Sequence, residues 1–200
     1  GEISVRHKGE LKSYEVEALV GADGPNSQVA KSANLYGERK FWIARQCRVK
    51  MKNNPELFKV YFGSQISNDF FGWVVPEDNN VARIGIGSEK NAEFYFKSFL
   101  NKLGNPEIID YQAGLIPIYD PKPRRSNGKV FLIGDAALQV KAISGGGIIK
   151  GMLAAEELSK ALLKNLDYEK LWRKRMGTDL WINLKIREML NRFSDNDYNK

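Results

Sequence analysis

Apolar and polar residues alternate in short runs over much of the first 118 residues, a pattern typical of β-strands. Two such runs flank the Lys8-Gly9 pair, which predicts a hairpin, and a further run extends to residue 20. Residues 41–51 alternate with one apolar side and predict a long strand. Three shorter antiparallel strands are predicted at 58–63, 71–75 and 81–87, and the polar residues 77–80 have the length of a hairpin connection.

Helical spacing of apolar residues begins near residue 91. Phenylalanine and leucine recur at this spacing up to residue 103, and we expect Asn91 to cap this helix and Gly104 to end it. After a strand at 111–118 and a linker with prolines, a helical segment is predicted at 148–163, and residues 153–166 have the pattern of an amphipathic helix. A longer, basic helix is predicted over 168–193, ahead of a polar end at 195–200.

The stretch from Gly128 to Ile148 carries the strongest chemical signal. Val130–Ile133 is a short apolar run that predicts a buried strand, and Gly134 ends it. Asp135 then stands at the carboxyl end of that strand, the edge at which open α/β sheets bind ligands. Three glycines, Gly145–Gly147, directly precede a helix, where backbone amides and the helix dipole favour negative charge. The pattern predicts a loop shaped to hold a large, charged cofactor.

Three motifs in this chain resemble those of a known flavoprotein superfamily. Gly134-Asp135-Ala136, with Gly145 to Ile148, resembles the second FAD-binding motif of flavoproteins built on the hydroxybenzoate-hydroxylase plan, and residues 19–27 resemble its Asp-Gly motif. Phe71-Gly72-Trp73-Val74-Val75-Pro76, followed by residues 84–87, is similar to the aromatic-x-Trp-x-x-Pro…Gly signature of the geranylgeranyl reductases. The matches follow the family's order and cover roughly residues 16–165.

The resemblance implies an FAD site whose residues divide between two loops. Asp135 would accept hydrogen bonds from the ribityl hydroxyls, and Asp23 with Gly24 would contact the FAD and the path of the reductant. Backbone amides near the pyrimidine edge of the flavin would come from Gly145, Gly146, Gly147 and Ile148, and Gly134 would also belong to the cofactor-binding residues. A plainer interpretation stays open, in which Asp135 caps a turn and Asp-Gly-Pro-Asn is an ordinary turn sequence.

The third motif would form the substrate site. Phe71, Trp73 and Pro76 would give an aromatic and apolar wall suited to an isoprenoid chain, which is held by shape and burial. The alternative is that these aromatic residues belong to an ordinary core. No catalytic residue is assigned, and Tyr61 and Tyr119 are candidates for the proton donor only because they lie in the presumed substrate domain.

These observations together predict an α+β fold, an incomplete version of the hydroxybenzoate-hydroxylase-like flavoprotein fold. An α/β remnant of the FAD-binding domain would comprise residues 1–36 and 127–165, and an antiparallel-sheet substrate domain residues 37–126. Residues 166–200 would form a C-terminal helical segment. The superfamily's Gly-x-Gly-x-x-Gly unit is not found, so we expect a C-terminal fragment that lacks the half with the ADP site.

The predicted function is FAD-dependent reduction of isoprenoid C=C bonds, with hydride transfer from the reduced flavin to a membrane lipid. The partners implied are the isoprenoid lipid and an external electron donor, either NAD(P)H or a ferredoxin-like protein. Two alternatives stay open. A flavin monooxygenase or halogenase shares Asp23-Gly24 and Gly134-Asp135 but does not require the signature at 71–76. An inactive lipid-binding or scaffold fragment is the other.

Composition excludes several other classes of protein. The chain has one cysteine and one histidine, Cys47 and His7, which excludes an intrachain disulfide and leaves too few ligands for a zinc site. The net charge is +7, but no nucleic-acid-binding module accompanies it, so no nucleic-acid partner is expected. The basic helix with Trp172 and Trp181 predicts either a solvated face with inward-packed aromatics or peripheral contact with a membrane. We expect a cytoplasmic location.

Overall fold

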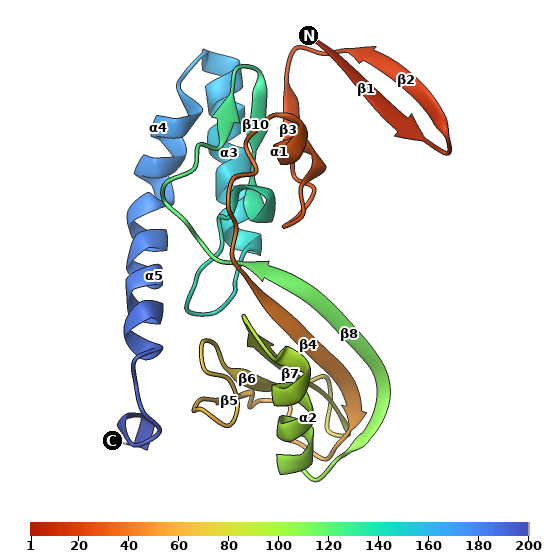
Figure 1. Ribbon diagram of the computed structural model, residues 1–200, viewed down its shortest axis with the longest axis vertical. Coiled ribbons are helices and arrows are strands. Elements are labelled where there is room, and N and C mark those ends of the chain that lie inside the picture. Colours follow the sequence, from red (N-terminus) through yellow and green to blue (C-terminus); the bar gives the residue numbers. More distant parts are fainter. Residues whose placement is uncertain (200) are drawn as a thin grey trace. The chain divides into compact units, whose positions relative to one another are not determined.

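The computed structural model describes residues 1–199, which form two compact units (Figure 1). The first unit comprises residues 1–39, 119–141 and 146–181, and the second comprises residues 40–118, 142–145 and 182 onward. Lys200, the last residue of the predicted polar end, lies outside the described residues. Each unit is therefore discontinuous in sequence, and the chain passes between them several times.

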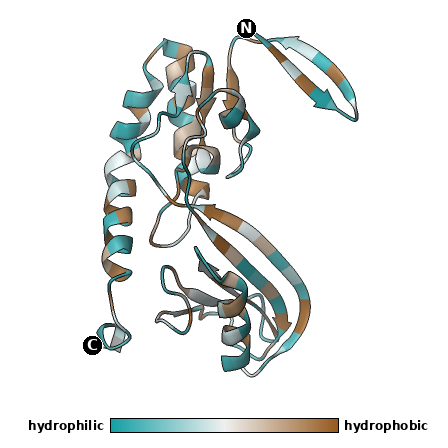
Figure 2. Cartoon of the chain, in the orientation of Figure 1, coloured by the Kyte–Doolittle hydropathy of each residue, from teal (hydrophilic) through white to brown (hydrophobic). Residues whose placement is uncertain are grey.

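The first unit begins with the predicted hairpin. Strands β1 (Glu2–His7) and β2 (Glu10–Glu15) are antiparallel, and the two turn residues Lys8 and Gly9 have φ angles of 49° and 87°. Positive φ at both positions is the requirement of a type I′ turn, which explains the Lys-Gly pair. Hydrophobic and hydrophilic residues alternate along β1, whereas β2 is mostly hydrophilic (Figure 2). All but one of their side chains are exposed.

A small three-stranded sheet carries the motifs of the first unit. Its order is β3 (Leu19–Gly21), β10 (Val130–Leu132) and β9 (Ser126–Asn127), with β3 and β10 parallel. The short helix α1 (Gln28–Ser32) follows β3, and the 3-10 turn η1 (Gly134–Ala137) follows β10. Parallel neighbours end at the same edge, so the loops after β3 and β10 emerge side by side.

Helices complete the first unit. Helix α3 (Ile148–Lys164) packs against η1 and against α4 (Tyr168–Trp172). The single long helix predicted at 168–193 is instead α4, a π-helical turn η2 (Arg173–Gly177) and α5 (Thr178–Leu190). The pattern could not indicate the wide turn because Trp172, Met176 and Leu180, all buried, keep a four-residue spacing through it.

The second unit is a five-stranded antiparallel sheet covered on one face by a helix. The strand order is β5 (Lys59–Tyr61), β6 (Gly72–Pro76), β7 (Val81–Ser88), β4 (Phe41–Lys50) and β8 (Glu107–Pro117). Helix α2 (Ala92–Lys102) packs on β4 and β7. The short 3-10 turn η3 (Asp197–Asn199) closes the described chain. The predicted strands are all present, although β8 begins four residues earlier than expected.

The alternation along β4 separates two faces of this sheet. Cys47 and Val49 point into the core under α2, with Val74, Ile84 and Ile86 from the neighbouring strands. Trp42 on β4 and Trp73 on β6 face the opposite side and belong to a separate aromatic cluster. One strand thus contributes to the structural core with one side and to the candidate site with the other.

One predicted cap is wrong. Asn91 does precede α2, but its backbone is left-handed (φ 56°, ψ 29°) and its side chain accepts no hydrogen bond from the helix. A capping side chain needs an extended backbone at that position to reach the first amides. The backbone carbonyl of Asn91 instead accepts from Tyr95 N–H at 3.1 Å.

The two units also divide the chain differently from the predicted domains. Residues 168–181 belong to the first unit and residues from 182 onward to the second, so the predicted C-terminal segment is not a separate body. Tyr119, expected in the substrate domain, belongs to the first unit. Within residues 1–199, no helix is both long and apolar enough to cross a bilayer.

The single thiol gives a direct test of the core beneath α2. Cys47 is fully buried, and burial, with a smaller contribution from the Asp110 carboxylate, raises the pKa of its thiol to about 11. We expect a thiol reagent such as DTNB to leave the native protein unmodified at pH 8, and to react with one thiol per chain after unfolding in guanidinium. Rapid reaction of the native protein would contradict a closed core.

Candidate functional site

The loop after β10 is held in place from behind by buried polar groups. Gly134 adopts φ 62°, a conformation that favours glycine, and its N–H donates to Gln139 Oε1 at 2.9 Å. Gln139 is fully buried, and its amide donates to the hydroxyl of the buried Tyr168 at 3.3 Å. Tyr168 in turn donates to the Leu132 carbonyl at 2.9 Å. This chain of hydrogen bonds fixes the strand end and the turn as one piece.

Asp135 presents a half-buried carboxylate that has no hydrogen-bond donor among residues 1–199. Burial raises the pKa of its carboxyl group, and no bond offsets that effect. A Cβ added to Gly147 would stand 2.7 Å from Asp135 Oδ1, so the carboxylate fills the space that a side chain at 147 would need. The structure therefore brings Asp135 and Gly147 together, twelve positions apart in sequence.

The start of α3 is open at the same place. Its cap residue is Gly147, which offers no side chain to the first amides, and Ile148 is 83% exposed. The helix approaches the turn closely, since a Cβ on Gly151 would lie 3.5 Å from Gly134 Cα. A seventeen-residue helix with uncapped first amides can interact with an anionic or electron-rich group. The triple glycine crosses the division of the chain, because Gly145 belongs to the second unit and Gly146 and Gly147 to the first.

Asp23 serves as a cap for α1. Its carboxylate accepts hydrogen bonds from the Ser27 hydroxyl at 2.5 Å and from the N–H groups of Gln28 and Val29 at 2.7 and 3.1 Å. Burial opposes ionisation of Asp23, but these bonds outweigh it and lower its pKa. Gly24, with φ 80°, makes the turn that brings the carboxylate back to the helix. These contacts give Asp23 a structural role beside any contact with a ligand.

In the second unit, the tryptophan of the signature lies flat on a glycine. A Cβ at Gly85 would be 2.4 Å from the Trp73 ring, and one at Gly87 would be 2.5 Å from the Phe70 ring. Trp73 Nε1 donates to Gln46 Oε1 at 2.8 Å, which fixes the orientation of the indole. The glycines at 85 and 87 are thus explained by the rings of β6 and of the segment before it.

These rings form a continuous aromatic surface, which we call the aromatic wall. Its buried members are Trp42, Phe70 and Ala142, and its partly buried members include Phe71, Trp73, Ile116 and Ile118. Phe71 stacks on Phe70 at 4.2 Å between ring centroids and meets Trp73 edge-on at 5.9 Å. Pro76 ends β6 and is half-buried, apart from these ring contacts.

A buried arginine supports the aromatic wall, and the sequence analysis missed it. Arg187 is 2% exposed, and its guanidinium donates to the Ala142 and Ile143 carbonyls at 3.1 and 2.6 Å. The same group lies 4.9 Å from the Phe70 ring centroid. Nothing in the sequence distinguishes Arg187 from the other basic residues of 168–193, because its acceptors lie more than 40 positions away.

Other candidates lie elsewhere. His7 is exposed at the end of β1, and Tyr61 packs edge-on against Phe99 in the core of the second unit. Trp172 is fully buried, whereas Trp181 is 48% exposed, so the tryptophans of the basic helix do not share one environment. Within residues 1–199, no cluster of three or more His, Cys, Asp or Glu could hold a metal ion.

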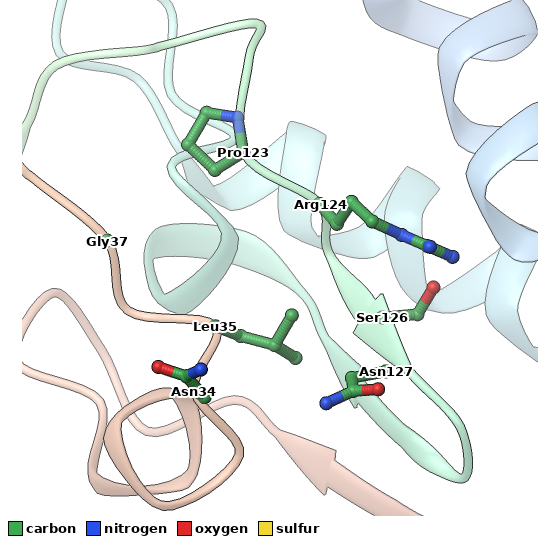
Figure 3. A pocket seen from close by; sticks show the side chains of 7 residues that line it. All are labelled: Asn34, Leu35, Gly37, Pro123, Arg124, Ser126 and Asn127. Carbon is green, nitrogen blue, oxygen red and sulfur yellow. The ribbon is translucent and has the colours of Figure 1, made fainter.

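A cavity of about 310 Å³ in the first unit does not coincide with these motifs (Figure 3). Leu35 points into it, while the Arg124 side chain extends away from it. Its lining residues are Asn34, Leu35, Gly37, Pro123, Arg124, Ser126 and Asn127. None of the predicted site residues is among them.

Comparison with curated proteins relates the chain to one group. It is 35% identical over 206 aligned residues to the chloroplastic geranylgeranyl diphosphate reductase of Nicotiana tabacum, an alignment that covers 92% of the chain and 44% of that protein. It is 30% identical to digeranylgeranylglycerophospholipid reductase 2 of Methanothermobacter thermautotrophicus, covering 94% of the chain and 54% of the relative. The chain is homologous to the geranylgeranyl reductases. The resemblance predicted from the sequence is confirmed, and the chain spans about half the length of these relatives. No protein-family model matches it.

Solved structures agree on the fold. A geranylgeranyl bacteriochlorophyll reductase-like protein from Thermoplasma acidophilum superposes with a TM-score of 0.82 at 24% identity, covering 98% of this chain and 56% of that one. The flavin-dependent halogenase CmlS (TM-score 0.61, 17% identity) covers 96% of this chain and 37% of its own. The aromatic hydroxylase CabE superposes with a TM-score of 0.62 at 16% identity, and the match covers 99% of this chain and 45% of CabE. The predicted α+β, hydroxylase-like fold, present only in part, is confirmed.

The fit of Trp73 on its glycine can be tested by adding one methyl group. Gly85→Ala should destabilise the protein by about 1–3 kcal/mol, because the new Cβ overlaps the indole ring. Gly114→Ala on β8 is a matched control, since nothing lies within 4 Å of its added Cβ, and it should stay within about 0.5 kcal/mol of the wild type. Urea unfolding would measure both, and equal midpoints would contradict the contact.

The two motif aspartates should shift stability in opposite directions. The raised pKa of Asp135 means that its ionised form costs stability at pH 7, so Asp135→Asn should raise the unfolding free energy there. The lowered pKa of Asp23 means that its ionised form stabilises, so Asp23→Asn should lower it. The Asp135 difference should shrink as the pH falls toward about 4, whereas the Asp23 difference should persist there and shrink only at lower pH. Chemical denaturation between pH 4 and 7 would check the signs, and a destabilised Asp135→Asn would refute the assignment for Asp135.

Proposed function

We propose that this chain is part of an FAD-dependent oxidoreductase that saturates the C=C bonds of isoprenoid chains, such as the geranylgeranyl groups of membrane lipids. The observation that carries the proposal is the 35% identity to a geranylgeranyl diphosphate reductase over 92% of the chain. The digeranylgeranylglycerophospholipid reductases among the relatives support a lipid as the substrate class. The proteins that share the fold of this chain include a flavin-dependent halogenase, which supports a flavin as the cofactor.

The residues of the first unit fit a flavin. The Asp135 carboxylate lacks a donor within residues 1–199, and ribityl hydroxyls are donors of the right kind. Gly147 leaves room for that carboxylate and for a ligand to approach the backbone closely. The uncapped amides at the start of α3 would stabilise the negative charge that a flavin gains on reduction. Asp23 and Gly24 would line the same ligand from the loop after β3.

Reduction of an isolated alkene places particular demands on the protein. When bound and reduced, a flavin would supply the hydride for one carbon, and a proton would have to reach the other, so that the C=C bond would become a saturated CH–CH bond. An alkene without a carbonyl offers nothing to polarise, so the protein contributes alignment and exclusion of water. The aromatic wall, with Phe71 and Trp73 partly exposed, would hold the isoprenoid chain by burial, whereas Pro76 lies outside it. NAD(P)H or a ferredoxin-like protein would return two electrons to the flavin.

The proposal also includes contact between the C-terminal basic helix and the surface of a membrane. Trp181 on α5 is 48% exposed, and the exposed residues of the basic helix would favour an anionic lipid surface. Several of its cations are already paired, however, such as Arg173 with Glu169 and Lys185 with Glu188. We therefore propose a weak contact that delivers the lipid substrate rather than a stable anchor.

The test of the reaction uses the natural protein that carries this sequence. We expect anaerobic incubation with chemically reduced FAD and a geranylgeranyl lipid to raise the product mass in steps of two hydrogens. A product that forms only under oxygen and gains an oxygen atom would overturn the proposed reductase activity. It would favour monooxygenation, the type of reaction suggested by the hydroxylase of the same fold. No product under either condition would leave a binding or scaffold role.

Loss of the aromatic wall should affect substrate use while the flavin stays bound. Trp73→Ala should lower kcat/KM by roughly 30-fold, because one large apolar contact with the isoprenoid chain is lost. Phe94→Ala is the control, since Phe94 is 68% exposed on α2 and outside the aromatic wall. Steady-state kinetics with a flavin absorbance spectrum would separate the two effects. Equal kcat/KM for both variants would remove Trp73 from the substrate site.

A further inference from the structure

One arginine connects the two loops that carry the predicted cofactor residues. The three nitrogens of the Arg39 guanidinium each donate to a different carbonyl oxygen: Nε to Tyr36 at 2.8 Å, Nη1 to Pro25 at 3.2 Å and Nη2 to Ala136 at 2.9 Å. Pro25 follows Asp23-Gly24 in the loop after β3, and Ala136 follows Asp135 in η1. One side chain thus reaches both motifs directly.

The guanidinium is held in a fixed plane. Its central carbon lies 4.1 Å from the centroid of the Tyr36 ring, and the Tyr36 hydroxyl donates to Asn26 Oδ1 at 3.3 Å. Asn26 belongs to the loop after β3, so the ring that supports Arg39 is itself attached to one of the loops that Arg39 joins. A planar fork with donors in several directions suits this task, whereas a lysine presents a single nitrogen.

The two strands alone do not fix the loops. β3 and β10 each have three residues, and their backbone pairing ends where Ile133 N–H donates to the Gly21 carbonyl at 3.0 Å. Beyond that point, no other hydrogen bond joins residues 22–27 to residues 134–137 within the described chain. The apolar cluster of Ala30, Leu132 and Ala137 packs behind the loops, and Arg39 is the side chain whose hydrogen bonds reach both of them within the described chain.

We propose that Arg39 is a positioning residue that locks the loop at 22–27 and the turn at 134–137 into one rigid cradle. A ligand that contacts both Asp23-Gly24 and Asp135 would meet them at a set separation, without ordering them on binding. The coupling of the loops rests on the contacts above, and its service to a flavin rests on the proposed function.

The test compares three variants by amide hydrogen exchange. Arg39→Met keeps the apolar stem on Tyr36, Arg39→Lys keeps the charge, and Lys31→Met is a matched control. Lys31 also stands over the Tyr36 ring, at 4.9 Å, but Arg39 alone of the two bonds to the loops. The reporters are Ser27 N–H in the first loop and Leu138 and Gln139 N–H after the second, which donate to Gly24, Asp135 and Gly134.

Both Arg39 variants should exchange roughly tenfold faster at these reporters in both loops, with α3 amides and the Lys31→Met protein unchanged. Faster exchange in one loop alone, or full rescue by lysine, would overturn the coupling. An equal increase throughout α3 would mean global unfolding and would overturn it too.

A second measurement decides whether the cradle serves the flavin. FAD titration of the natural protein that carries this sequence, with the same substitutions and followed by flavin absorbance and fluorescence, should show at least tenfold weaker binding for Arg39→Met and none of this loss for Lys31→Met. Unchanged affinity alongside faster exchange would overturn the ligand half of the inference. If the wild-type protein takes up no FAD, the proposed function fails, and the exchange data still decide the role of Arg39.

Discussion

The parallel pairing of β3 with β10 is the constraint on which the first unit depends. Only three residue pairs, from Val130 opposite Leu19 to Leu132 opposite Gly21, bring together segments more than 100 positions apart. The fit around them is tight, since a Cβ on Gly21 would lie 2.7 Å from Leu132 and 2.9 Å from Val29. Because both strands end at one edge, the loops that follow become neighbours. The arrangement of Asp23 and Asp135 is a consequence of that register.

In the second unit, the two faces of one sheet have different surroundings. The α2 face buries aliphatic and aromatic side chains into an ordinary core, which includes the inert thiol of Cys47. The opposite face exposes rings that are held in place by backbone, by Gln46 and by the buried Arg187. The structural core and the proposed substrate wall thus lie on opposite sides of β4, β6 and β7. Changes on one face can proceed with limited effect on the other.

The sequence predicted those features whose cause is local. Alternation located the strands, and the glycines at 134 and 147 could be recognised because a positive φ or a close approach excludes other residues. The residues that organise the sites were not visible. Arg39 bonds to a carbonyl 97 positions away, and Gln46 accepts a hydrogen bond from Trp73, 27 positions away. Such partners are set by topology, which no local pattern encodes. The predicted domain boundary at residue 36 even separated Arg39 from the loops that it joins.

The glycines beneath Phe70 and Trp73 have a consequence for how this protein can diversify. The floor under the rings is main chain, because Gly85 and Gly87 place no side-chain atoms there. Mutation at these two positions can only raise the floor and push the rings out, so it offers no graded adjustment. Variation in the shape of the wall must come from the rings themselves or from the neighbouring strands. Under the proposed function, proteins descended from this sequence that accept isoprenoid chains of other lengths should differ in the rings of the wall or in β8, while positions 85 and 87 remain glycine.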